Sequence, residues 1–171
     1  MPTGTKPSKI DLNALLKGLN EARVEFILVG GLAAVIQGAP VTTFDLDIVH
    51  RQTDKNIKKL KKFLKSVRAI QRRPDKKIIE PDEKGFSGTG HLLLATCFGP
   101  LDVLGSIEKG LGFDDLLPSA IEIEFQGHPT YILNLETMVA LKRGSKNPKE
   151  QYQLQIYKET LRLKRQTENP D

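Results

Sequence analysis

Residues 24–50 read VEFILVGGLAAVIQGAPVTTFDLDIVH, and this stretch decides the fold. Its apolar run at residues 24–29 predicts a buried β-strand, which the Gly30-Gly31 pair ends. Residues 32–37 predict a short helix, and residues 43–49 predict a second strand that carries two aspartates. The stretch therefore predicts a strand, a glycine turn, a short helix and a second strand.

The two aspartates of the second predicted strand are Asp45 and Asp47. Because side chains alternate along a strand, both are expected on one face, with Leu46 and Ile48 in the core. Two neighbouring ionised carboxylates repel each other, and a divalent cation between them removes that repulsion. Mg²⁺ binds through one or two carboxylates, waters and phosphate oxygens. The alternative is a solvent-facing strand, although aspartate is disfavoured in strands.

Two further features fit a site for metal and phosphate. The Gly30-Gly31 pair lets a phosphate group approach the backbone at the start of a helix, although a plain tight turn also explains two glycines. A third carboxylate, Asp102, begins another predicted strand in GPLDVLG, residues 99–105. On its own Asp102 is better explained as a turn-capping residue. If its strand lies beside the strand that carries Asp45 and Asp47, Asp102 completes a three-carboxylate site for two metal ions.

The rest of the chain alternates helical and strand patterns. We expect helices at 8–22 (capped by Ser8), 54–68, 112–120, 134–141 (capped by Asn134) and 148–163, strands at 91–98 and 101–105, and a hairpin of 121–125 with 129–133. A frayed tail is expected from residue 166. The pattern predicts an α/β (α+β) fold, a small mixed β-sheet flanked by helices. We expect one domain over residues 1–171, with a core at about 10–133 and C-terminal helices at about 134–163.

Composition narrows the function classes. The net charge of +5, from 26 basic and 21 acidic residues, permits contact with a polyanion but does not require it. The absence of tryptophan and the 6% aromatic content argue against a base-stacking platform. Six lysines between Lys55 and Lys65 lie opposite the apolar stripe of their predicted helix. They form either a solvated surface or a face for RNA such as tRNA.

Other segments bear on compartment and cofactors. No apolar stretch is long enough to cross a membrane, and residues 1–10 lack the apolar core of a signal peptide, so we expect a cytoplasmic protein without a membrane partner. The single cysteine, Cys97, is expected in the core. Its isolation, with three scattered histidines, argues against zinc, and no P-loop motif is present.

The arrangement resembles the nucleotidyltransferase superfamily, whose fold is shared with DNA polymerase beta. It is most similar to small prokaryotic domains that include toxins of toxin–antitoxin and abortive-infection systems. There the stretch reads Gly-Gly, a helix, then Gly-x-x-Arg-x-Thr-x-Asp-x-Asp. The matching residues are Gly38, Thr43, Asp45 and Asp47, whereas Val41 stands at the arginine position.

The C-terminal part of the chain extends this resemblance. LETMVALKRGSKNPKEQYQL, from Leu135, follows the family layout of a helix, a basic turn and a second helix. Lys142 falls on the lysine that the resemblance places near the nucleotide phosphates, and Glu150 on an acidic position after Pro-Lys. A solvated lysine on an amphipathic helix is the alternative for Lys142. The resemblance covers about residues 10–163.

The resemblance implies transfer of a nucleoside monophosphate from a nucleoside triphosphate to an acceptor hydroxyl, on an RNA or tRNA end, a protein or a small molecule. Mg²⁺ or Mn²⁺ would be held by Asp45, Asp47 and Asp102, and the phosphates by Gly30, Gly31, Thr43 and Lys142. Val41 leaves open a catalytically inactive binding module. Three other roles also stay open: an antitoxin-like partner protein, a toxin bound by its antitoxin, and an RNA-binding module that acts through the basic helix.

Overall fold

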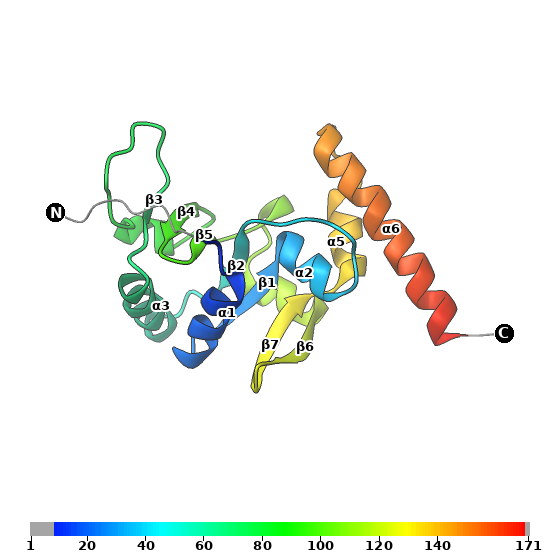
Figure 1. The fold of residues 1–171 in the computed structure, drawn as a ribbon, viewed down its shortest axis with the longest axis horizontal. Helices are drawn as coiled ribbons and strands as arrows, with labels where there is room; N and C mark the ends of the chain where they lie inside the picture. Colours follow the sequence, from blue (N-terminus) through cyan, green and yellow to red (C-terminus); the bar gives the residue numbers. More distant parts are fainter. Residues whose placement is uncertain (1–8, 170–171) are drawn as a thin grey trace.

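The computed structural model describes residues 9–169. The main elements, shown in Figure 1, are α1 (Leu12–Glu21), β1 (Phe26–Val29), α2 (Gly30–Ile36), β2 (Leu46–His50), α3 (Asp54–Ser66), β3 (Ile70–Gln71), β4 (His91–Thr96), β5 (Gly99–Leu104), α4 (Phe113–Leu116), β6 (Ala120–Phe125), β7 (His128–Leu133), α5 (Leu135–Lys142) and α6 (Pro148–Glu168). Short 3₁₀ turns lie at Glu83–Phe86, Glu108–Gly110 and Leu117–Ser119.

One seven-stranded sheet runs through the molecule in the order β3-β4-β5-β2-β1-β7-β6. The pairs β2–β5 and β1–β7 are parallel and the other neighbours are antiparallel, so the sheet is mixed, as predicted. All four residues of β1 are buried because strands flank it on both sides and helices cover it. This explains why the continuous apolar run at residues 26–29 predicted its strand well.

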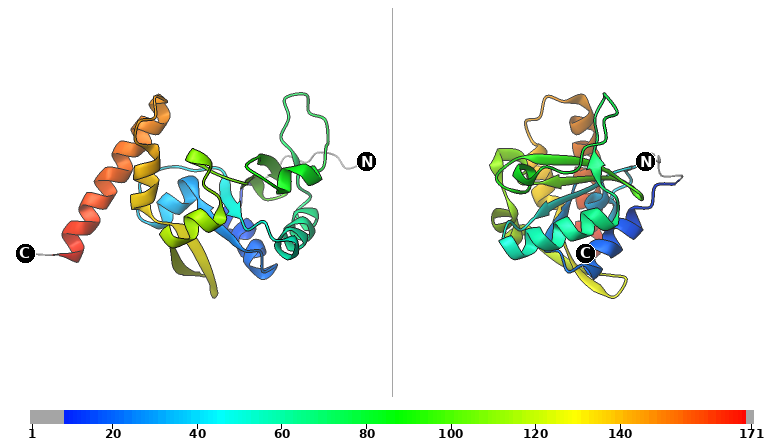
Figure 2. Two further views of the ribbon diagram at one scale, coloured as in Figure 1. Left: turned by 180° about the vertical axis from the view of Figure 1, so that it is seen from behind. Right: turned by 90° about the vertical axis from the view of Figure 1, so that its left-hand side faces the viewer.

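Helices α1 and α3 lie together against the sheet, and α6 lies at the opposite end of the molecule, packed against α5 (Figures 1 and 2). The apolar stripe of α1, formed by Leu15, Leu16 and Leu19, is fully buried. Among the described residues no helix combines the length and the apolar character that crossing a membrane requires.

Gln37 fixes α2 relative to the C-terminal elements. Its buried amide nitrogen donates to the carbonyl oxygens of Ala33 and Leu133, each at 2.9 Å, and its amide oxygen accepts from the Leu135 N–H at 2.8 Å. A buried polar side chain satisfied in this way specifies one arrangement of its neighbours. Gln37 therefore sets the position of α5, whose last residue is Lys142, relative to α2, whose first residue is Gly30.

Several predicted boundaries were wrong near the N-terminal half of the sheet. The Gly30-Gly31 pair forms the first turn of α2 rather than a separate turn before it. β2 begins at Leu46, so Thr43 and Asp45 precede the strand. The reason is that β1 ends at Val29, which pairs with Asp47, and residues 43–45 have no partner strand beyond that point. Ser8 lies outside the described residues, and Asp11 caps α1 instead.

Other predictions fail at turns and at helix ends. Cys97 is exposed because it lies in the turn between β4 and β5, whereas Gly99 begins β5 itself. Helix α6 continues to Glu168, so the frayed tail predicted from residue 166 is wrong there; no glycine or proline interrupts it before Pro170. The hairpin of β6 and β7 and the Asn134 cap of α5 are confirmed.

Candidate active site

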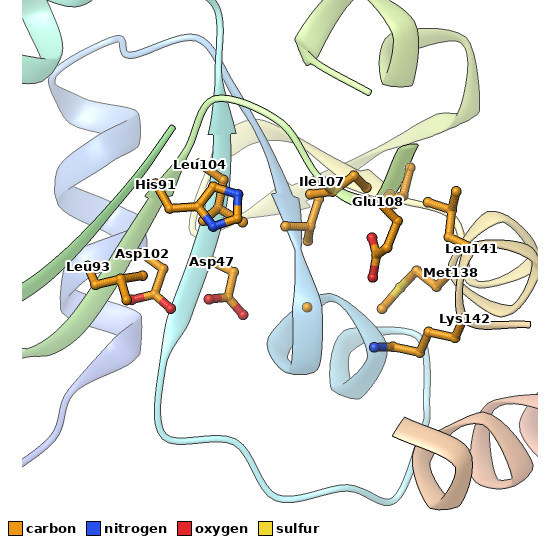
Figure 3. Close-up of a pocket in the computed structure, with 13 residues that line it drawn as sticks. Asp47, His91, Leu93, Asp102, Leu104, Ile107, Glu108, Met138, Leu141 and Lys142 are labelled. Carbon is orange, nitrogen blue, oxygen red and sulfur yellow. The ribbon is translucent and has the colours of Figure 1, made fainter. Parts of the chain in front are cut away.

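Three carboxylates converge at one edge of β2 and β5. The parallel register of these strands pairs Asp47 with Asp102, and Asp45 lies just before β2. Each of the three side chains offers one carboxylate oxygen, and these oxygens lie within 4.8 Å of one another. Figure 3 shows Asp47 and Asp102 side by side on one face of the sheet. The structure therefore brings together the three residues that the sequence singled out as metal ligands.

The electrostatics of the cluster reflect its burial and its crowding. Burial first, and then the charge of Asp102 and a hydrogen bond with it, raise the pKa of Asp47 to about 7. Burial also raises the pKa of Asp102, and the neighbouring Arg72 opposes that rise. Without a cation the cluster therefore favours a proton shared between Asp47 and Asp102, and a divalent cation would replace it.

The glycine pair lies directly against the cluster. Gly30 has a φ of +72°, and a Cβ atom placed there would come within 2.1 Å of Asp47 Oδ2. A Cβ atom on Gly31 would lie 2.9 Å from the Thr43 hydroxyl oxygen. Any side chain at these two positions would therefore displace Asp47 or Thr43. The glycines leave the backbone of the first turn of α2 open beside the carboxylates.

Thr43 and Lys142 come from different elements: Thr43 lies beside Gly31, and Lys142 lines the same cleft as Asp47 and Asp102. The Thr43 hydroxyl donates to the Asp45 carbonyl oxygen at 3.2 Å, which shapes the loop before β2. Lys142 ends α5, its side chain is only 16% exposed, and its Nζ lies 3.9 Å from Glu150 Oε1. Glu150 also accepts a hydrogen bond from the Ser145 hydroxyl. Lys142 therefore supplies a positive charge to the site that Glu150 partly balances.

A cleft of about 260 Å³ is lined by Gly30, Asp47, Asp102 and Lys142, whereas Gly31, Thr43 and Asp45 are not among its lining residues. Its polar side chains include Asp47, Asp102, His91, Glu108 and Lys142, and Figure 3 shows Asp47 and Asp102 on one side of the view and Glu108 and Lys142 on the other. The rest of its lining is apolar: Val29, Leu93, Leu104, Ile107, Leu133, Met138 and Leu141. The cleft thus combines a charged edge with an apolar wall, as small-molecule sites commonly do.

The sequence reasoning missed His91 and Glu108, which line the cleft, and two further residues near the carboxylates. Arg72 follows β3, and its Nη2 donates to Asp102 Oδ1 at 2.7 Å. Tyr157 of α6 is buried, and burial together with the charge of Asp47 raises the pKa of its phenol. Arg72 stood in a basic run of the sequence, but nothing in that run indicated a two-residue strand beside Asp102.

The lysines of α3 do not line this cleft. Lys61 pairs with Glu83 and lies 5.3 Å from the centre of the Phe86 ring, while Lys59 donates to the Arg23 carbonyl oxygen. The lysines at 55, 58, 62 and 65 are exposed. The structure therefore places the basic helix away from the carboxylates, and an RNA-binding role for it stays a prediction.

Comparisons with known proteins bear on the fold. No protein family model matches the chain, and no curated protein does. Among solved structures, the lincomycin-bound lincosamide antibiotic adenylyltransferase LnuA aligns with a TM-score of 0.60 and 12% identity, over 88% of this chain and 98% of its own. The antibiotic-resistance factor ANT(2'')-Ia aligns with a TM-score of 0.54 and 13% identity, over 88% of this chain and 82% of its own.

An antigenic nucleotidyltransferase-like protein from Paracoccidioides brasiliensis also aligns, with a TM-score of 0.49 and 16% identity, over 88% of this chain and 73% of its own. The first two alignments cover most of both chains at very low identity, so they establish architecture rather than substrate. The mixed sheet with its C-terminal helices therefore has the nucleotidyltransferase fold.

Proposed function

We propose that the protein is a metal-dependent nucleotidyltransferase that moves a nucleoside monophosphate from a nucleoside triphosphate to an acceptor hydroxyl. One observation carries this proposal: Asp45, Asp47 and Asp102 converge within 4.8 Å directly beside the open backbone of Gly30. Three carboxylates held this closely repel one another, so aspartates that were only solvated by water would be more stable farther apart.

The residues fit a divalent cation. Their donor set is all oxygen, which suits Mg²⁺ or Mn²⁺, and the burial that raises the pKa of Asp47 disfavours three bare charges. Asp45, Asp47 and Asp102 would hold the metal. Bound there, the metal would neutralise phosphate charge and lower the pKa of the acceptor hydroxyl.

The chain's own residues would position the substrates. Gly30 and Gly31 leave room for the triphosphate against the first turn of α2, and Thr43 adds a hydroxyl beside it. Lys142 would neutralise the charge that develops on the leaving pyrophosphate. The acceptor oxygen forms a bond to the α-phosphorus, the bond from that phosphorus to the bridging oxygen breaks, and pyrophosphate leaves with the electron pair. Asp102 would take the proton of the acceptor hydroxyl.

Three kinds of acceptor remain candidates: an RNA or tRNA end, a protein hydroxyl and a small molecule. If the protein is the toxin of a toxin–antitoxin system, the acceptor is one of the first two. LnuA and ANT(2'')-Ia, by their names, concern antibiotics. Their low identity to this chain gives no reason to prefer an antibiotic acceptor here.

A second candidate is a nucleotidyltransferase fold without catalysis, acting as a binding or regulatory module. The observation that favours it is Val41, which stands where the resembling domains have arginine and packs against the hydrophobic core. A valine side chain offers a phosphate neither a positive charge nor a hydrogen-bond donor. Binding of nucleotide without transfer would distinguish this candidate.

The test is transfer of label from each α-labelled nucleoside triphosphate, with Mg²⁺ or Mn²⁺ and a cell extract that supplies RNA and protein acceptors. Asp45→Asn is expected to abolish transfer and metal binding, while Asp114→Asn, an exposed aspartate outside the cleft, keeps both. Undiminished transfer by a folded Asp45→Asn protein would contradict the proposal. Nucleotide binding with no transfer by the wild type would favour the inactive module.

A further inference from the structure

Arg72 lies in the same row of the sheet as the carboxylates. Its N–H donates to the Leu93 carbonyl oxygen at 2.9 Å, and Leu93 pairs with Asp102 across β4 and β5. Asp102 pairs in turn with Asp47, and Asp47 with Val29, which precedes Gly30. The carboxylates therefore have the glycine pair on one side and Arg72 on the other.

The Arg72 guanidinium has unused hydrogen-bonding capacity. It carries five N–H donors, and in residues 9–169 one hydrogen bond is recorded for them, to Asp102 Oδ1 at 2.7 Å. Its side chain is 32% exposed, so a ligand can reach it. A planar guanidinium with free donors matches the geometry of a phosphate group.

The next residue provides a contrast. Arg73 donates from Nε and Nη2 to the two carboxylate oxygens of Asp75, at 3.0 and 2.8 Å. Its guanidinium is thus already held by a bidentate partner. Lys76 and Lys77, on the same loop, are exposed. Over residues 72–82 this loop carries four basic and three acidic residues, and Arg72 is the one whose side chain contacts the carboxylate cluster.

The direction of the reaction connects these observations with the acceptor. In phosphoryl-group chemistry the attacking and leaving oxygens lie roughly in line on opposite sides of the phosphorus. If the triphosphate lies along Gly30, Gly31 and Lys142, as the proposed function holds, the acceptor hydroxyl approaches from the side of Arg72. On that basis we infer that Arg72 binds the acceptor and that the acceptor carries a phosphate group near its attacking hydroxyl.

The experiment measures binding without turnover. The wild-type protein is loaded with Mn²⁺ and a nucleoside triphosphate analogue with a methylene group between the α- and β-phosphorus atoms. Binding of a labelled single-stranded RNA is then followed by fluorescence anisotropy. We expect Arg72→Ala to weaken RNA binding about 10- to 100-fold, the range for losing a charged hydrogen-bonded pair. Arg72→Lys keeps the charge and is expected to weaken it less.

Arg73→Ala is the matched control. It removes the same charge at the neighbouring position, where the Arg73 side chain is already paired with Asp75. It is expected to change RNA binding by less than about 3-fold, since an exposed charge contributes little. Equal losses in Arg72→Ala and Arg73→Ala would show a general charge effect and overturn the assignment. Thermal melting of each variant separates lost binding from lost folding.

Competition identifies the source of the phosphate. Displacement of the RNA by ribose 5-phosphate but not by ribose supports a small phosphorylated acceptor, and resistance to both supports a nucleic-acid strand. Failure of the wild type to bind either phosphate-bearing probe would overturn the inference. Binding of the triphosphate analogue is measured in parallel. If the wild type does not bind the triphosphate analogue, the proposed function is contradicted. If Arg72→Ala binds the analogue but no longer binds RNA, Arg72 acts on the acceptor and not on the triphosphate.

Discussion

Asp47 of β2 and Asp102 of β5 are register partners in a parallel strand pair and lie side by side. The two strands are far apart in the sequence, because β2 follows a helix near the N-terminus and β5 follows a hairpin turn in the middle of the chain. Parallel partners place matching side chains on the same face. The carboxylates therefore meet because of backbone pairing, and their separation is fixed by the sheet rather than by flexible loops.

The raised pKa of Asp47 predicts a pH-dependent stability. Because its pKa rises from the ordinary 3.8 to about 7 in the folded state, the folded protein binds a proton that the unfolded chain releases. In metal-free solution the stabilisation is complete below about pH 4 and is lost as the pH rises towards 7. Asp47→Asn removes that loss, and a shift of about three pKa units corresponds to about 4 kcal/mol, so we expect the free energy of unfolding at pH 8 to increase by up to about that amount. Urea denaturation at pH 5 and pH 8 measures the difference, and an equal effect at both values would contradict it.

Metal binding should depend on pH for the same reason. A cation must displace the proton held by Asp47 and Asp102, so Mn²⁺ affinity should rise with pH up to about 7 and then level off. Electron paramagnetic resonance of free Mn²⁺, titrated with protein, measures this. A pH-independent affinity between pH 5 and 7 would argue that the site binds no cation through Asp47.

Gly30→Ala should be much more damaging than another glycine substitution. The added methyl group would lie 2.1 Å from Asp47 Oδ2, on a backbone with a φ of +72°. Gly127→Ala has a similar φ of +81° but meets no atom within 4 Å, so it isolates the backbone strain, about 1 kcal/mol. We expect Gly30→Ala to cost more stability than Gly127→Ala and to abolish nucleotide binding. Thermal melting and binding of a labelled triphosphate check both, and equal behaviour of the two variants would contradict the close packing.

Lys142→Gln should weaken triphosphate binding about 10-fold, the effect of losing one charge-assisted contact. Lys146→Gln, an exposed lysine on the following turn, removes the same charge outside the cleft and should have little effect. Glu150→Gln frees Lys142 from its partner and should strengthen binding. Calorimetric titration with a non-transferable triphosphate analogue provides the measurement, and similar losses in the two lysine variants would exclude a specific role for Lys142.

The sequence predicted the centre of the fold well because its signals were local and strong there. The apolar run of β1, the glycine pair and the spacing of Asp45 and Asp47 all lie within one short stretch. The side chains of Asp45 and Asp47 do converge, although Asp45 lies before the strand rather than in it. The boundary was missed because it depends on where β1 ends, and sequence periodicity does not reveal the register of pairing.

Features set by distant contacts escaped the sequence reasoning. β3 has two residues, too few for any periodic pattern, yet it places Arg72 beside Asp102. The exposure of Cys97 follows from a tight turn that leaves Gly99 and Pro100 inside β5. The position of β3 depends on which strand lies next to which, and local residues do not encode that choice. The turn at Cys97 is local, between the paired residues Thr96 and Gly99, and the apolar residues before it hid it.

The parallel pairing of β2 with β5 also has a consequence for biosynthesis. Asp45 and Asp47 leave the ribosome well before Asp102, and the third carboxylate joins them only when β5 pairs with β2. The closing contact joins residues far apart along the chain, and such contacts form late because loop-closure entropy opposes them. Under the proposed function, a nascent chain therefore carries an incomplete cation site, and nucleotidyl transfer would begin only when the newly made protein has finished folding.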